Sequence, residues 1–92
     1  MEYIIYKTHY PPSALPAYSA LSTENNNSFG SNTLQKLAEL MIQDARGETV
    51  AVRSFAKGDW TPALVPPSSL DCEELNKIIL EIERLKAARE KK

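Results

Sequence analysis

Two proline pairs set the limits within which this chain of 92 residues can fold. Pro11-Pro12 and Pro66-Pro67 each remove two consecutive backbone N–H donors, and proline fits neither a helix interior nor a central strand. No helix or inner strand can therefore run through either pair. The length favours one domain, residues 1–92, with one modest hydrophobic core.

The segment before the first proline pair, residues 3–10 (YIIYKTHY), is rich in aromatic and β-branched side chains, which predicts a strand. Successive side chains of a strand point to opposite faces. One face is the more apolar, and we expect it to pack on the core; it carries Ile4, Tyr6, Thr8 and Tyr10. The other face, with Tyr3, Ile5, Lys7 and His9, is expected to be solvated.

Residues 11–31 mix proline, serine, asparagine and glycine with scattered apolar side chains. We interpret this tract as one long loop, and loops of this length are typically binding loops, compact surface loops or disordered segments. Pro16 would be favoured at a first helical position, which allows a short helix up to Leu21 within the tract.

A helix is predicted next, because apolar residues recur at helical spacing from Leu34 to Ala45. Asn32 or Thr33 supplies the N-cap, and Gly47 ends the helix. Residues 48–56 (ETVAVRSFA) alternate like a strand, and the helix before them can cross over so that this strand lies parallel to the first. Residues 60–65 predict a short third strand, at an edge because Pro62 lacks an N–H.

The last predicted helix covers residues 70–89, after a capping pair that begins at either Ser68 or Asp71. Acidic residues lie at its start and basic residues at its end, in favourable order for the helix dipole. Its expected core stripe consists of Cys72, Leu75, Ile78, Ile79, Ile82 and Leu85. Leu80 falls outside this stripe, with Ala87 on the same side.

These elements predict an α+β fold in the order β-α-β-(β)-α, with a small two- or three-stranded sheet packed against two helices. Net charge is −1, so bulk electrostatics favour neither nucleic acid nor a membrane surface. The single cysteine excludes an internal disulfide, and no segment has the apolar length of a signal peptide or membrane span. We therefore expect a cytoplasmic protein without membrane contact.

Catalytic and cofactor chemistry find little support in the sequence. Cys72 and His9 are the only thiol and the only imidazole, and no orienting residue accompanies them. One cysteine and one histidine do not make a closed zinc site, and the three glycines form no phosphate-binding motif. We expect no enzyme, no catalytic residues, no metal and no cofactor.

The leading hypothesis is a small non-enzymatic interaction protein that acts as an inhibitor, adaptor or regulatory subunit, with another protein or a second copy as its partner. Trp60 is interpreted first as packing over the connection between strand and helix, and otherwise as a binding anchor. The residues expected to contact a partner are Trp60, Leu80, Ala87, Tyr18, Leu21 and Phe29.

The alternative hypothesis is a nucleic-acid-binding module. Aromatic and cationic side chains that share one face of a sheet can stack on bases and contact phosphates. The residues expected on such a face are Tyr3, Lys7, His9, Arg53 and Phe55.

Overall fold

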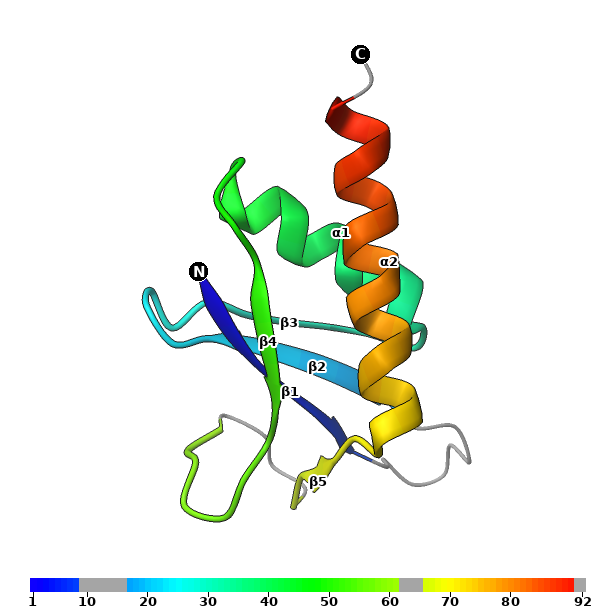
Figure 1. Ribbon diagram of the computed structural model, residues 1–92. Helices are drawn as coiled ribbons and strands as arrows, with labels where there is room; N and C mark the ends of the chain where they lie inside the picture. The colour runs from blue at the N-terminus through cyan, green and yellow to red at the C-terminus, as the bar shows by residue number, and fades with distance from the viewer. Residues whose placement is uncertain (9–16, 62–65, 91–92) are drawn as a thin grey trace.

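The structure of the chain, a computed structural model, describes residues 1–8, 17–61 and 66–90. It is an α+β fold with a mixed five-stranded sheet and two helices, in the order β-β-β-α-β-β-α (Figure 1). The elements are β1 (Glu2–Thr8), β2 (Ala17–Ser22), β3 (Ser28–Ser31), α1 (Leu34–Ala45), β4 (Ala51–Ser54), β5 (Ser68–Ser69) and α2 (Cys72–Glu90).

The strands lie in the order β3-β2-β1-β4, so that β1 is central and β4 is at one edge. β1, β2 and β3 form an antiparallel meander, whereas β4 pairs with β1 in parallel after the α1 crossover, as the sequence predicted. The short β5 pairs antiparallel with Tyr6 and Lys7, just beyond the part of β1 that β4 occupies.

The prediction of one long loop over residues 11–31 is wrong, because this tract carries both β2 and β3. The helix predicted from Pro16 to Leu21 is also wrong, since residues 17–22 pair with β1 along its length. The serine- and alanine-rich sequence of β2 has little local preference for an extended strand. β2 is extended because its backbone groups find hydrogen-bond partners on β1. Residues 11–16 lie outside the described ranges.

The third strand also differs from the prediction. Trp60 and Thr61 belong to no strand, and the rest of the predicted segment, residues 62–65, lies outside the described ranges. Residues 68–69 form the additional strand instead.

The face of β1 that meets the helices is the one predicted to be solvated. Tyr3 and Ile5 are fully buried in the core with residues of both helices, and the other face is covered as well, with Ile4, Tyr6 and Thr8 all nearly inaccessible. A central strand that is buried on both faces shows no alternation of burial. The difference in apolar character between the two faces of β1 therefore did not indicate which face meets the helices. His9 and Tyr10 lie outside the described residues.

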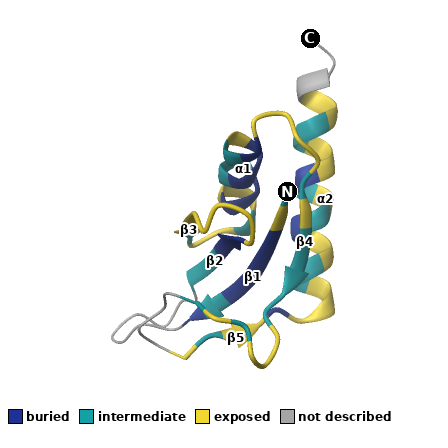
Figure 2. Cartoon of the chain, turned by 90° about the vertical axis from the view of Figure 1, so that its left-hand side faces the viewer, coloured by how far each residue is buried: buried dark blue, intermediate teal, exposed yellow. Residues whose placement is uncertain are grey.

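Both helices pack on the face of the sheet that carries Tyr3 and Ile5 (Figures 1 and 2). Thr33 is the N-cap of α1, where its hydroxyl accepts a hydrogen bond from the Lys36 backbone. Asp71 and Glu74 form a reciprocal capping box at the start of α2, because each side chain accepts from the other's backbone N–H.

The core stripe of α2 is narrower than predicted and centres on Ile78 and Ile82, with Leu75 and Leu85 packed at its margins. Cys72, predicted on this stripe, is exposed, and Ile79 is only half-buried. The helix therefore presents one side of the predicted stripe to α1 and the sheet and leaves the other side beside β4. Within the described part of the chain, neither helix combines the length and the apolar character that crossing a membrane requires.

Candidate functional site

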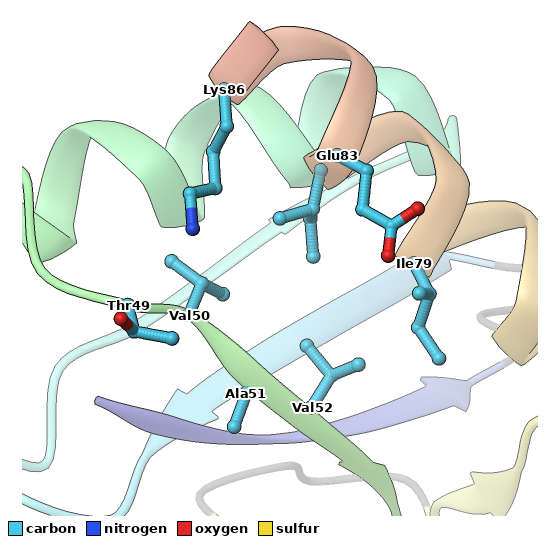
Figure 3. Close-up of a pocket in the computed structure, with 8 residues that line it drawn as sticks. Thr49, Val50, Ala51, Val52, Ile79, Glu83 and Lys86 are labelled. Carbon is cyan, nitrogen blue, oxygen red and sulfur yellow. The ribbon is translucent and has the colours of Figure 1, made fainter.

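A groove separates α2 from the edge strand β4 (Figure 3). Its volume is about 410 Å³, and its apolar lining comes from Val50, Val52, Ile79 and Ile82. Figure 3 shows Glu83 and Lys86 extending from α2 above the strand, so that one acid and one base stand at the rim. The groove exists because α2 turns its buried stripe toward α1 and leaves Ile79 without close packing on β4.

The outer edge of β4 is unpaired among the residues that the structure describes. The backbone N–H groups of Ala51 and Phe55 donate to the carbonyls of Met1 and Ile5, both at 2.9 Å. Since alternate residues of a strand direct their backbone groups to opposite sides, the N–H and C=O of Val52 point away from β1. An edge of this kind can pair with another strand, and no proline interrupts it.

A short loop after β4 presents Trp60. The Asp59 carboxylate holds this loop, because it accepts two hydrogen bonds from the Arg53 guanidinium, at 2.8 and 3.0 Å, and one from the Ala56 backbone at 2.8 Å. These hydrogen bonds, Arg53 foremost, lower the pKa of Asp59 to about 2. Gly58 has a φ of 100°, which the turn requires and which other residues rarely adopt.

Trp60 is 70% exposed. The interpretation that Trp60 packs over the connection between strand and helix is therefore wrong. The loop is closed by the Asp59 hydrogen bonds, so its geometry does not depend on burying the ring. A tryptophan this exposed on a structured loop is available to a partner.

A second exposed apolar region lies on the outer side of α2. Leu80 is 63% exposed, and Ala87 on the same side of the helix is exposed as well. The prediction that Leu80 lies outside the core stripe is confirmed. The other three residues expected to contact a partner are part of the sheet: Leu21 is buried in β2, and Tyr18 and Phe29 are half-buried.

Tyr18 takes part in a polar cluster that fixes α2 on the sheet. Glu74 accepts from the Lys7 ammonium at 2.7 Å and from the Tyr18 hydroxyl at 2.8 Å. The hydrogen bond from Lys7, with smaller help from Tyr18 and the Asp71 backbone, lowers the pKa of Glu74 to about 2. Lys7 is thereby committed to an internal contact.

Tyr3 is committed in the same way at the other end of the sheet. Its hydroxyl donates to Asp44 at 2.6 Å, and Asp44 also accepts from the side-chain amide of Asn27 at 3.0 Å. Burial and the bond to Asp44 raise the pKa of Tyr3, and the bond from Tyr3 lowers the pKa of Asp44. The Phe29 ring lies 5.9 Å from the Tyr3 ring, so this cluster joins β3, β1 and α1.

The residues of the predicted nucleic-acid face do not share a face. Tyr3 and Lys7 point toward the helices, whereas Arg53 lies in register with Ile4 and so belongs to the opposite side. Phe55 packs on Tyr6 on that side, with ring centres 6.3 Å apart. His9 lies outside the described residues; of the other four, Tyr3 and Lys7 lie on one side of the sheet and Arg53 and Phe55 on the other.

Cys72 is exposed at the first residue of α2, and the contact with His9 that a nucleophile pair would need falls on an undescribed residue. Across residues 1–8, 17–61 and 66–90, no group of three or more histidine, cysteine, aspartate or glutamate side chains could hold a metal ion.

No model of a known protein family matches the sequence, and neither a curated protein nor a solved structure is significantly similar to the chain.

Proposed function

We propose that this chain is a non-enzymatic interaction module that binds another protein, with Trp60 as its anchor, and changes what that protein does as an inhibitor, adaptor or regulatory subunit. The observation that carries the proposal is that Trp60 is 70% exposed on a loop that the Asp59 carboxylate holds in place. Tryptophan is among the residues that contribute most to binding when a partner's pocket desolvates them.

The hydrogen bonds around Asp59 lower the entropic cost of binding. A loop that is ordered before contact loses less conformational freedom than one that must be ordered by its partner. The planar Arg53 guanidinium is bidentate toward Asp59. This is the geometry that most restricts the relative orientation of an arginine and a carboxylate. The complementary surface on the partner is an apolar pocket of the size of an indole.

Leu80 and Ala87 provide a second contact region on α2 in this proposal. A single exposed leucine is common on protein surfaces, so this region carries less weight than Trp60. Leu21, Tyr18 and Phe29 support the binding surface by building the sheet. The one cysteine has a free, exposed thiol, which suits a reducing compartment such as the cytoplasm.

The test is capture of partners from the native host with the tagged chain, read by mass spectrometry, in three forms: the parent, Trp60→Ala, and Lys57→Ala as a matched control. Lys57 is exposed on the same loop, so Lys57→Ala removes another accessible side chain and leaves the indole in place. We expect the specific partner to be lost with Trp60→Ala and kept with Lys57→Ala.

A purified partner allows a second measurement, because Trp60 is the only tryptophan of the chain. Its fluorescence is expected to shift to shorter wavelength and to become protected from acrylamide quenching when a tryptophan-free form of the partner binds. Affinity should change little with salt. A steep loss of affinity with salt, together with capture of nucleic acid, would favour the alternative nucleic-acid hypothesis.

A further inference from the structure

We draw no further inference here: the strongest candidate, the apolar groove between α2 and the edge strand β4, carries none because nothing in the part of the chain that the structure describes shows what covers it.

Discussion

At the scale of single residues, adjacent side chains of α2 lie in different environments. Ile78 is fully buried between the sheet and α1, whereas its neighbour Ile79 is half-buried and lines the groove beside β4. The helical turn of 100° per residue is enough to move a side chain from the core to a surface that a partner can cover. Helical spacing alone assigned both isoleucines to the core.

The two isoleucines give a matched pair of truncations. Ile78→Ala should lower the free energy of unfolding by about 2–4 kcal/mol, because it leaves a cavity in a packed core. Ile79→Ala should cost less than about 1.5 kcal/mol at low protein concentration, since the side chain already borders open space. Urea unfolding of both variants measures the difference, and equal losses would show that the groove beside Ile79 is closed in solution.

At the scale of elements, the loop after β4 is held by polar contacts and presents an apolar side chain. Asp59 joins the loop to Arg53, which also lies 3.6 Å from Glu2 of β1. These contacts of Arg53 thus connect the loop to two strands of the sheet. The loop keeps its shape although Trp60 contributes little burial.

Asp59→Ala tests this account of the loop. We expect the sheet and helices to remain folded and the melting temperature to change little. Trp60 should become more mobile, since three hydrogen bonds to the loop are lost, and time-resolved fluorescence anisotropy of the single tryptophan reports this directly. Partner capture should weaken as well, because ordering the loop then becomes part of binding. An unchanged anisotropy would mean that other contacts hold the loop.

At the scale of the whole molecule, buried or half-buried carboxylates connect the layers. Glu74 joins the start of α2 to β1 and β2, and its pKa of about 2 lies below the ordinary value of 4.5. Asp44 joins α1 to β1 and to the turn before β3, and its pKa is also lowered. A carboxylate with a lowered pKa in the folded state stabilises the fold when it is ionised.

The pH dependence follows from these signs. The contribution of Glu74 is complete above its unfolded pKa near 4.5 and is lost as pH falls toward its folded pKa of about 2. Glu74→Gln should therefore be less stable than the parent at about pH 6, and the gap should narrow by about pH 3. Lys77→Ala, on the exposed side of the same helix, is the control and should keep the parental pH profile. A constant gap would show that Glu74 acts through packing alone.

The sequence by itself determined both helices and the first and fourth strands, and it narrowed each helix start to two caps, of which the structure uses Thr33 and Asp71. These signals are local, because a helix satisfies its backbone within four residues and a cap within three. The exposure of Leu80 followed from the same periodicity.

Only the tertiary structure decided the rest. β2 forms because β1 supplies its hydrogen-bond partners, and β3 pairs in turn with β2, although the sequences of both strands carry little strand signal. The direction of Tyr3, the exposure of Trp60 and the groove at β4 depend on which layer covers which face. Strand pairing and layer packing join residues far apart in sequence, so no local pattern encodes them.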